Sequence, residues 1–191
     1  MHNRHKILVA DDNPYNLDLL KDLLENRYLL RTTDDSSRVF PLLDEFNPDI
    51  LVLDILMPGL DGYEISRQIR SSENFKFIKI IAISGQTRIE QRLKAYECGA
   101  DDFIIKPFDQ DELLAKINVF LRLKHAEEIE QMKTDLLHLF SHETRTSLNG
   151  ILSMAQLLEK SPTAGAEDRE KAKLIYSSGL NLFSYVTKCM R

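Results

Sequence analysis

Residues 51–62 read LVLDILMPGLDG, and this stretch decides how the first part of the chain folds. Together with Ile50 it opens as an almost continuous apolar run, which is expected of a strand covered on both faces of a parallel sheet. The run ends at Asp54, and Pro58-Gly59 then predicts a tight turn. In open parallel sheets the chemistry gathers at the carboxyl ends of the strands, so Asp54 marks the edge at which to look for a site.

The same alternation of apolar runs and amphipathic helical patterns extends through residues 1–123. Strands are predicted over Lys6–Ala10, Tyr28–Thr32, Ile50–Leu53, Ile78–Ile83 and Phe103–Ile105. Helices are predicted over 14–26, 36–46, 62–71, 87–98 and 110–123, with Gly99 where a C-terminal helix cap belongs. The pattern therefore predicts an α/β domain with a (βα)5 doubly wound parallel sheet.

Residues 124–191 predict an all-α helical hairpin with helices over about 124–160 and 168–190. Residues 110–160 contain no proline, so we expect the last helix of the α/β domain to run into the hairpin as one rod. A seam with the alternating three- and four-residue spacing of a coiled coil is formed by Ile129, Met132, Leu136 and Leu139. Because two antiparallel helices cannot bury such faces alone, we expect two copies to form a four-helix bundle in a homodimer.

Charge and composition argue against several functional classes. The 191 residues carry a net charge of −5, and residues 124–191 hold equal numbers of acidic and basic side chains. An acidic chain without a basic stripe is a poor candidate for binding nucleic acid. No run approaches the roughly 18 apolar residues of a membrane span, and no signal-peptide core follows the N-terminus. With Cys98 and Cys189 as the two cysteines, we expect a reducing cytoplasm rather than a disulfide framework.

Polar groups stand at the carboxyl ends of four predicted strands. They are Asp11 and Asp12 after the first, Asp54 after the third, Ser84 after the fourth and Lys106 after the fifth. Three carboxylates placed together repel one another, so they bind a hard divalent cation or raise a pKa, and oxygen ligands suit Mg²⁺. A carboxylate can also attack phosphorus to form an acyl phosphate, while a lysine and a hydroxyl stabilise the transferring group.

Taken one at a time, these residues have ordinary explanations. Asp12 alone could cap a helix, Lys106 could be a surface charge, and Ser84 could belong to a turn. Their joint occurrence at matched strand ends, together with the turn after Asp54, favours a phosphoryl-transfer site instead.

Four segments carry a family resemblance: VADDN (9–13), LVLDILMPGLDG (51–62), IIAIS (80–84) and FIIKPF (103–108). Over residues 4–123 they resemble the motif set of the two-component response-regulator receiver domain. The resemblance implies a flavodoxin-like fold with Asp54 as the phosphoacceptor. It also implies a Mg²⁺ site formed by Asp11, Asp12, Asp54 and the backbone carbonyl of Leu56.

The same resemblance gives roles to three further residues. Ser84 would hydrogen-bond to the phosphoryl group and Lys106 would pair with it, while Phe103 would be the aromatic side chain that repositions on activation. Ser84 stands where threonine is commoner, but the hydroxyl is retained, so we expect function to survive.

Residues 140–150 read FSHETRTSLNG and lie within the first helix of the predicted hairpin. A polar stripe at helical spacing runs through Asp135, His138, His142, Thr146, Asn149 and Ser153. An imidazole beside Glu143 can be held in a reactive tautomer, or give up its proton to the acid as it attacks phosphorus. His125 and His138 are interpreted as solvated or capping side chains.

The surroundings of His142 resemble the H-box of histidine kinase dimerisation and phosphotransfer domains, and the similarity extends over residues 125–190. This resemblance implies that His142 is phosphorylated and that Glu143 is the general base. Thr146 would orient water or the aspartyl phosphate in a phosphatase reaction. Ser147 occupies the usual proline position, so we expect a straighter and stiffer helix there.

No ATP-binding motif follows the hairpin: the sequence has no Gly-rich lid, GxGxxG or Walker lysine. We therefore expect a receiver–hairpin fragment of a hybrid-type histidine kinase, in which ATP enters only through a catalytic domain outside this chain. The expected partners are a second copy and a partner kinase, phosphotransfer protein or response regulator, with no nucleic acid and no membrane.

The sequence leaves more than one function open. Phosphorylation of Asp54 could regulate His142, or phosphate could be exchanged between the two residues. The alternative is a stand-alone phosphotransfer or adaptor protein without kinase activity, and the complete set of acidic, hydroxyl and lysine groups argues against a pure adaptor.

Overall fold

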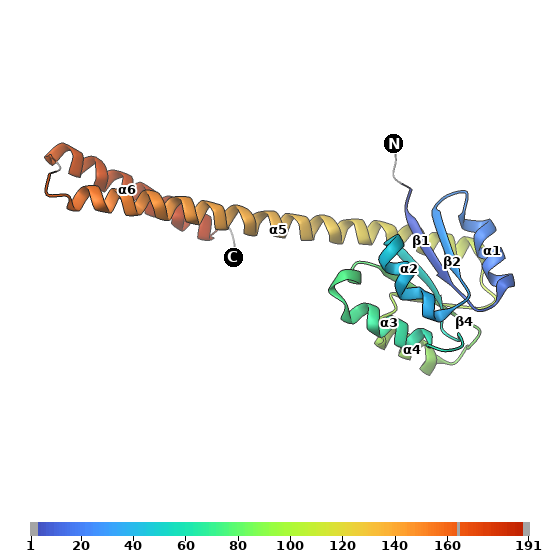
Figure 1. Ribbon diagram of the computed structural model, residues 1–191. Helices are drawn as coiled ribbons and strands as arrows, with labels where there is room; N and C mark the ends of the chain where they lie inside the picture. Colours follow the sequence, from blue (N-terminus) through green and yellow to red (C-terminus); the bar gives the residue numbers. More distant parts are fainter. Residues whose placement is uncertain (1–3, 164, 189–191) are drawn as a thin grey trace. The chain divides into compact units, whose positions relative to one another are not determined.

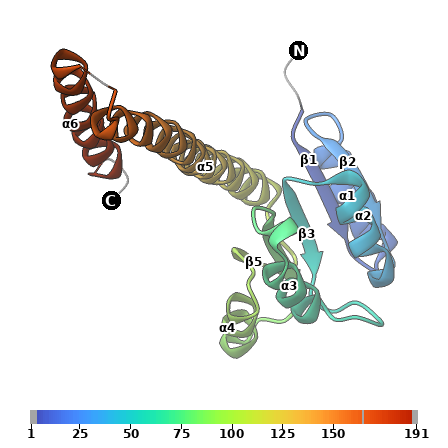
Figure 2. The ribbon, with the colours of Figure 1, turned by 60° about the vertical axis from the view of Figure 1, so that its left-hand side comes forward.

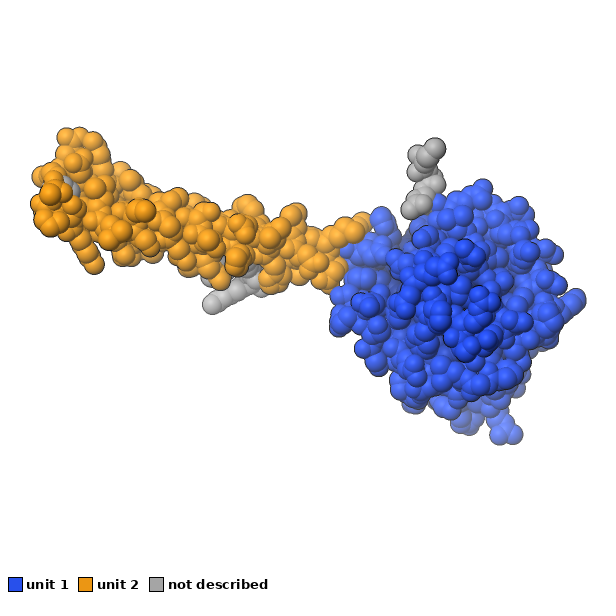
Figure 3. All heavy atoms as spheres, in the orientation of Figure 1, with its two compact units in different colours: residues 1–128 blue, residues 129–191 orange. Residues whose placement is uncertain are grey.

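The structure is a computed structural model that describes residues 4–163 and 165–188. The chain divides into two compact units, Met1–Glu128 and Ile129–Arg191, which are coloured separately in Figure 3. The first unit holds a β-sheet with its helices, and the described part of the second unit is helical except for a short loop.

A five-stranded parallel sheet with the order β2-β1-β3-β4-β5 forms the centre of the first unit (Figures 1 and 2). The strands are β1 Lys6–Ala10, β2 Leu29–Thr33, β3 Ile50–Asp54, β4 Lys79–Ser84 and β5 Asp102–Ile105. The strands β1, β3 and β4 are buried along almost their whole length, as their continuous apolar sequences require. This strand order is that of flavodoxin-like folds, so the predicted fold of this unit is confirmed.

Most strand boundaries differ by a residue from the predicted ones. β2 begins one residue later because the Tyr28 N–H still bonds to the Leu24 carbonyl, and the Tyr28 ring packs into the core. β3 and β4 each extend one residue further, so that Asp54 pairs with Ile83 and Ser84 pairs with Ile105. Both predicted site residues therefore belong to the hydrogen-bonded sheet itself.

The helices of the first unit are α1 Pro14–Leu24, α2 Val39–Phe46, α3 Gly62–Ser71, α4 Ile89–Glu97 and the beginning of α5 Gln110–Lys160. The predicted helix over 36–46 starts instead as a 3₁₀ turn at Ser36–Arg38, where the side chain of Asp35 accepts the Ser37 N–H. A second 3₁₀ turn, Glu73–Phe75, has no counterpart in the prediction. The helix predicted over 87–98 is shorter, at Ile89–Glu97.

Side-chain caps start the two helices that follow β1 and β3. The Asn13 Oδ1 accepts the Tyr15 N–H at 3.0 Å, with Pro14 at the first helical position. The Asp61 Oδ1 accepts the Glu64 N–H at 2.7 Å at the start of α3. These caps fix where each helix begins, and so fix the loops that carry the site.

Two apolar layers cover the sheet, because alternate residues of each strand point to opposite faces. One layer packs α1 and α5 on the sheet through Ile7, Val9, Leu20, Leu24, Val52, Leu113 and Ile117. The other packs α2 and α3 on the opposite face through Leu8, Val39, Leu43, Leu51, Leu53, Ile65 and Ile69. The sheet is thus covered on both sides, as a parallel sheet requires.

The second unit is a hairpin of the later part of α5 and of α6 Ala166–Lys188. Helix α5 is continuous over 51 residues, in agreement with its proline-free sequence. The helices approach closely at Gly179, where a Cβ atom would lie 2.8 Å from the Leu152 Cδ2. The side chains buried in the hairpin include Leu148, Leu152, Ala155 and Ala172. Helix α6 begins two residues earlier than predicted, and its predicted end at residue 190 lies outside the described residues.

Many large apolar side chains of the second unit remain exposed. The predicted seam of Ile129, Met132, Leu136 and Leu139 has exposed fractions of 50–67%. One hairpin does not cover this surface, and the four-helix bundle of a dimer remains a prediction. Within residues 4–163 and 165–188, no helix combines the length and the apolar character that a membrane crossing requires.

Candidate functional site

The carboxyl edge of the sheet brings together the polar residues predicted there. Asp11 directly follows β1, Asp54 and Ser84 end β3 and β4, and Lys106 directly follows β5. Parallel pairing of β1, β3, β4 and β5 places these ends along one edge. The structure therefore assembles residues that are up to 95 positions apart in the chain.

Three carboxylates form the acidic part of this edge. The ligand atoms of Asp11, Asp12 and Asp54 all lie within 4.8 Å of one another. Asp11 and Asp54 are buried, with exposed fractions of 1% and 7%, whereas Asp12 is exposed. Buried carboxylates at such short range are destabilised unless a cation compensates their charge or one of them is protonated.

Lys106 supplies part of that compensation. Its Nζ lies 2.6 Å from the Asp11 Oδ2 and 2.6 Å from the Asp54 Oδ2. Burial alone would lower the pKa of Lys106, but the hydrogen bonds to Asp11 and Asp54 and their charges outweigh it and raise the pKa. The lysine is therefore held as a cation beside two of the three carboxylates.

Asp11 has a neutral partner that the sequence reasoning missed. The Asn16 Nδ2 lies 3.0 Å from the Asp11 Oδ1 and 3.2 Å from the Asp11 Oδ2, and the Asn13 N–H donates to Oδ1 at 3.0 Å. Asn16 is on the first turn of α1, five residues after Asp11. When a helix starts soon after an aspartate at the end of a strand, the first turn of the helix lies close to that aspartate. The five-residue spacing from Asp11 is therefore the signal that could have pointed to Asn16.

The loop after Asp54 is braced from two sides. The Leu56 N–H donates to the Asp54 Oδ1 at 2.9 Å. The buried Ser36 hydroxyl donates to the Pro58 carbonyl at 2.8 Å and accepts the Leu60 N–H at 3.1 Å, a contact that the sequence did not predict. Gly59 has a φ of 86°, in the left-handed region that favours glycine.

Gly62 and the two remaining predicted site residues, Ser84 and Phe103, have the following surroundings. A Cβ atom at Gly62 would lie 2.6 Å from the Asp54 carbonyl oxygen, so glycine lets α3 start close to β3. The Ser84 side chain is buried, and its Oγ accepts the Gln86 N–H at 3.2 Å. Phe103, the predicted aromatic switch, is buried in the layer that faces α2 and α3.

The acidic edge has the donor chemistry that a hard divalent cation requires. All the ligand atoms of the cluster are carboxylate oxygens, and their mutual distances allow one ion to be shared. The exposed Asp12 leaves one side of the cluster open to water. Leu56, whose carbonyl is the predicted further ligand, lies in the loop directly after Asp54. The residues present therefore fit Mg²⁺.

The predicted residues of the hairpin lie on the surface of α5. The His142 side chain is 77% exposed, and its Nδ1 lies 3.5 Å from the Glu143 Oε1. The Thr146 hydroxyl donates to the His142 carbonyl at 3.0 Å, within the same helix. The structure thus places an exposed imidazole beside a carboxylate, one turn before a hydroxyl.

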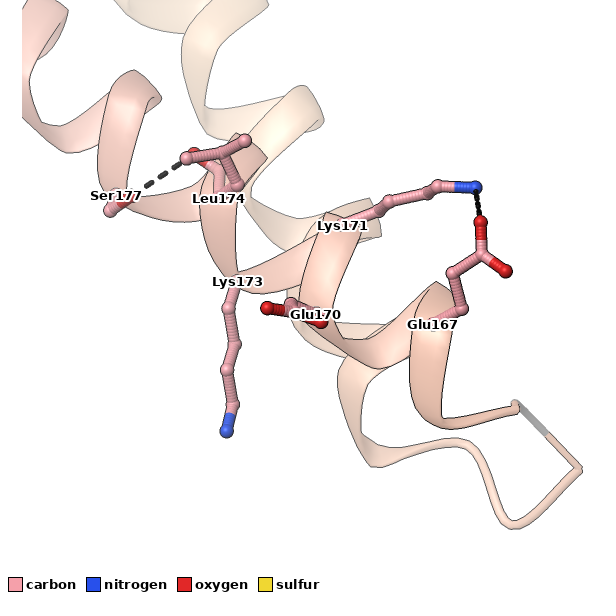
Figure 4. A pocket seen from close by; sticks show the side chains of 6 residues that line it. All are labelled: Glu167, Glu170, Lys171, Lys173, Leu174 and Ser177. Atoms are coloured by element: carbon pink, nitrogen blue, oxygen red, sulfur yellow. Dashed lines mark hydrogen bonds and ion pairs between the residues drawn. The ribbon is translucent and has the colours of Figure 1, made fainter.

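Hollows also occur on the surface of the hairpin. The hollow in Figure 4 is lined by α6 alone, through Glu167, Glu170, Lys171, Lys173, Leu174 and Ser177. Its Lys171 Nζ already pairs with the Glu167 Oε1 at 2.6 Å, which is typical of a solvated helix face. An apolar groove between α5 and α6 is lined by Ser147, Gly150, Ile151, Met154, Ala155, Leu158 and Ile175.

Comparison with known proteins identifies the family of the first unit. The family model of the response regulator receiver domain matches residues 7–118, more than half of the chain. The chain belongs to this family. Its first unit is a receiver domain of two-component signalling.

Relatives of the receiver domain occur in kinases and in response regulators. Hybrid signal transduction histidine kinase D of Dictyostelium discoideum is 29% identical over 201 residues, a match that covers 83% of this chain and 13% of that protein. Response regulator MprA of Mycobacterium ulcerans is 33% identical over 124 residues, covering 65% of this chain and 53% of that protein. The chain thus spans about half the length of the response regulator and a small part of the kinase.

A solved structure shows the same receiver fold. The signal receiver domain of a signal transduction histidine kinase from Syntrophus aciditrophicus has a TM-score of 0.58 and 28% identity, covering 62% of this chain and 90% of that chain.

The match to the Dictyostelium kinase covers more of this chain than the receiver domain does. It covers 83% of this chain, whereas residues 1–123 make up less than two thirds of the chain. That match therefore extends beyond the receiver domain into the helical part.

Proposed function

We propose that Asp54 of the receiver domain, residues 1–123, accepts a phosphoryl group and so controls or exchanges phosphate with the helical hairpin, residues 124–191. One observation carries the proposal: Asp11, Asp54 and Lys106 meet at 2.6 Å contacts on the carboxyl edge, with Asp12 beside them. A buried cluster with more carboxylates than cations is poised to take up positive charge and a phosphoryl group.

In the proposed reaction an oxygen of Asp54 forms a bond to phosphorus, while the bond from phosphorus to the donor breaks and its electron pair leaves with the donor. Mg²⁺ held by Asp11, Asp12, Asp54 and the Leu56 carbonyl would offset the negative charge of the phosphoryl oxygens. Within the chain, the Leu56 N–H holds the Asp54 Oδ1, which leaves Oδ2 as the oxygen that Lys106 contacts.

Lys106 and Ser84 complete the phosphoryl contacts in this proposal. Lys106 breaks its hydrogen bond to Asp54 and pairs with a phosphoryl oxygen. The ammonium charge of Lys106 then lies next to the negative charge of the phosphoryl group and stabilises it. The Ser84 hydroxyl, fixed at the end of β4, donates to another phosphoryl oxygen. Phe103 is the buried side chain that would reposition on activation.

We propose His142 as the second phosphoacceptor, with Glu143 as its general base. The exposed imidazole and the 3.5 Å separation of the His142 Nδ1 and the Glu143 Oε1 support this role, because a base must reach the proton that it removes. Thr146 is the proposed phosphatase residue, and its hydroxyl would have to leave the His142 carbonyl in order to donate a hydrogen bond to water. The match to the hybrid kinase beyond residue 123 supports a kinase context.

The hairpin is the proposed dimerisation domain. Its exposed apolar residues include Met132, Leu136, Met154 and Leu174, with exposed fractions of 67–71%. Such a surface on a monomer is unfavourable in water, and a second hairpin would cover it as a four-helix bundle. In this reading the chain is the receiver and dimerisation part of a histidine kinase and does not use ATP alone. The second candidate is a stand-alone phosphotransfer or adaptor protein.

The first test is chemical phosphorylation of the full chain. We expect incubation with Mg²⁺ and a small acyl-phosphate donor to add one phosphate, seen by intact mass, that hydroxylamine removes. Asp54→Asn should abolish the adduct, and Asp44→Asn, an exposed carboxylate on α2, should leave it unchanged. An adduct that survives Asp54→Asn would refute the assignment of the phosphoacceptor.

The second test separates a relay from a one-way regulator. A donor kinase domain phosphorylates the Asp54→Asn chain, which is then mixed with the His142→Ala chain in a single turnover. Transfer of label to the His142→Ala chain is the expected result for phosphate exchange, and His138→Ala in place of His142→Ala serves as the matched control. Label that never leaves the Asp54→Asn chain would favour regulation without exchange.

A further inference from the structure

Asn16 stands out among the neighbours of the acidic edge because it is uncharged. Its side-chain amide is half-buried on the first turn of α1 and faces both carboxylate oxygens of Asp11, at 3.0 and 3.2 Å. An ionised carboxylate only accepts hydrogen bonds, so the NH₂ end of the amide must be the end that faces it. Asn16 is therefore a donor to Asp11.

The two oxygens of Asp11 are each held by two donors. Oδ1 accepts the Asn13 N–H and the Asn16 amide, and Oδ2 accepts the Asn16 amide and the Lys106 ammonium. Asn16 is thus the one side chain, among the described residues, that touches both oxygens. Two donors on each oxygen leave the Asp11 carboxylate little freedom to rotate.

Lys106 and Asn16 differ in what they do when a cation approaches. The ammonium of Lys106 competes with a metal ion for the same carboxylate charge and is repelled by it. The neutral amide of Asn16 orients the carboxylate without opposing the ion, as hydrogen-bond donors outside a metal's own ligands commonly do. When Lys106 turns to the phosphoryl group, Asn16 and the Asn13 N–H are what keeps Asp11 in place.

We propose that Asn16 is a positioning residue that presents Asp11 to the divalent cation. This inference rests on the proposed function, in which Asp11 is a Mg²⁺ ligand. Asn16 itself contacts neither the cation nor the phosphoryl group. Its contribution is to restrict the rotation of Asp11, so that less freedom is lost when the ion binds.

The direct test is Mg²⁺ binding to the full, unphosphorylated chain, measured by calorimetry. Asn16→Ala and Asn16→Leu should each raise the dissociation constant for Mg²⁺ about tenfold, at the low end of the effect of removing such a donor. Asn118→Ala is the matched control, because it truncates another asparagine of the receiver domain, whose Oδ1 accepts the Tyr28 hydroxyl at 3.3 Å. Its affinity for Mg²⁺ should equal that of the unaltered chain.

A kinetic measurement distinguishes positioning from a general loss of structure. With the acyl-phosphate donor, the Asn16 variants should need more Mg²⁺ for the half-maximal rate but reach the same rate at saturating Mg²⁺. Affinities within twofold of the unaltered chain in both Asn16 variants would overturn the inference and leave the proposed function standing. An equal loss in Asn118→Ala would overturn it as well. Failure of the unaltered chain to bind Mg²⁺ would overturn the inference and the proposed function together.

Discussion

The two edges of the receiver sheet are built from the same kinds of side chain but differ in their balance of charge. At the carboxyl edge three carboxylates lie together, and the ammonium of Lys106 pairs with two of them, Asp11 and Asp54. At the amino edge, acids and bases form two groups of ion pairs. One group holds His5, Asp49, Lys124 and Glu128, and the other holds Arg70, Lys79, Asp101 and Glu127. We call these two groups together the amino-edge network.

The lysines of the amino-edge network are nearly buried, and each has two acidic partners. Lys79 has an exposed fraction of 8%, and its Nζ lies 2.7 Å from the Glu127 Oε1 and 3.7 Å from the Asp101 Oδ1. Lys124 has an exposed fraction of 9%; it contacts the Asp49 Oδ1 and lies 3.1 Å from the Glu128 Oε1. Buried ammonium groups are tolerated because they are paired in this way.

The difference separates a structural cluster from the proposed phosphoryl-transfer site. In the amino-edge network each Asp, Glu, Lys and Arg side chain has a partner of opposite sign. At the carboxyl edge, repulsion between the excess negative charges destabilises the folded state, and a bound divalent cation would remove this repulsion. What indicates ligand binding in a cluster of charged side chains is therefore an excess of one sign of charge, and not the number of charged residues.

The largest expected effect is at the amino edge. Asp49→Ala should lower the free energy of unfolding by about 3 kcal/mol, because it removes the carboxylate that pairs with the nearly buried Lys124. It also removes the acceptor of the Lys6 N–H, which lies 2.8 Å from the Asp49 Oδ2. Urea denaturation of the full chain measures the change.

The control for this substitution is Asp44→Ala on the exposed face of α2, which should change the free energy of unfolding by less than about 0.5 kcal/mol. A loss at Asp49→Ala no larger than the loss in the control would mean that the amino-edge network adds little to the stability of the receiver domain.

The two edges should also respond to opposite ends of the pH scale. Burial alone would raise the pKa of Asp49, but hydrogen bonds from Lys124 and the Lys6 N–H, with the nearby positive charges, outweigh it and lower the pKa. Its contribution is therefore present above the unfolded value of about 3.9 and is lost as the pH falls through the lowered native value. The pKa of Lys106 is raised, so its contribution is present below about 10.4 and is lost as the pH rises through the native value.

Denaturation curves at several pH values test this contrast. The difference in stability between the unaltered chain and Asp49→Ala should shrink as the pH falls below about 4. The difference between the unaltered chain and Lys106→Met, measured without Mg²⁺, should instead shrink as the pH rises above about 10.4. Differences that stay constant with pH would show that charge pairing does not account for either contribution.

The same contrast explains what the sequence could predict. The carboxyl edge was accessible because the strand-end rule for parallel sheets brings Asp11, Asp54 and Lys106 together without any knowledge of side-chain contacts. The amino-edge network joins Lys79 to Glu127 and Asp49 to Lys124, pairs that lie 48 and 75 residues apart. These pairs depend on where α5 returns over the sheet, which no local pattern specifies.

Smaller features of the site divide in the same way. The fold, the apolar runs of β1, β3 and β4 and the bounds of α3 follow from periodicity and caps. Ser36 and Asn16 were missed because their hydroxyl and amide act through contacts formed in three dimensions. The 3₁₀ start at Ser36–Arg38 escaped prediction because it depends on the single Asp35 cap rather than on apolar spacing.

The smallest expected effect tests the imbalance at the carboxyl edge directly. Asp12→Asn removes one of three carboxylates whose ligand atoms lie within 4.8 Å of one another, so it should raise the free energy of unfolding by about 0.5 kcal/mol without Mg²⁺. In saturating Mg²⁺ the sign should reverse, because the variant has lost a ligand and gains less from the ion. Asp18→Asn, an exposed acid on α1, should keep the Mg²⁺ dependence of the unaltered chain. A variant that is less stable than the unaltered chain without Mg²⁺ would mean that Asp12 is already compensated, and that the charge deficit at this edge is smaller than the geometry indicates.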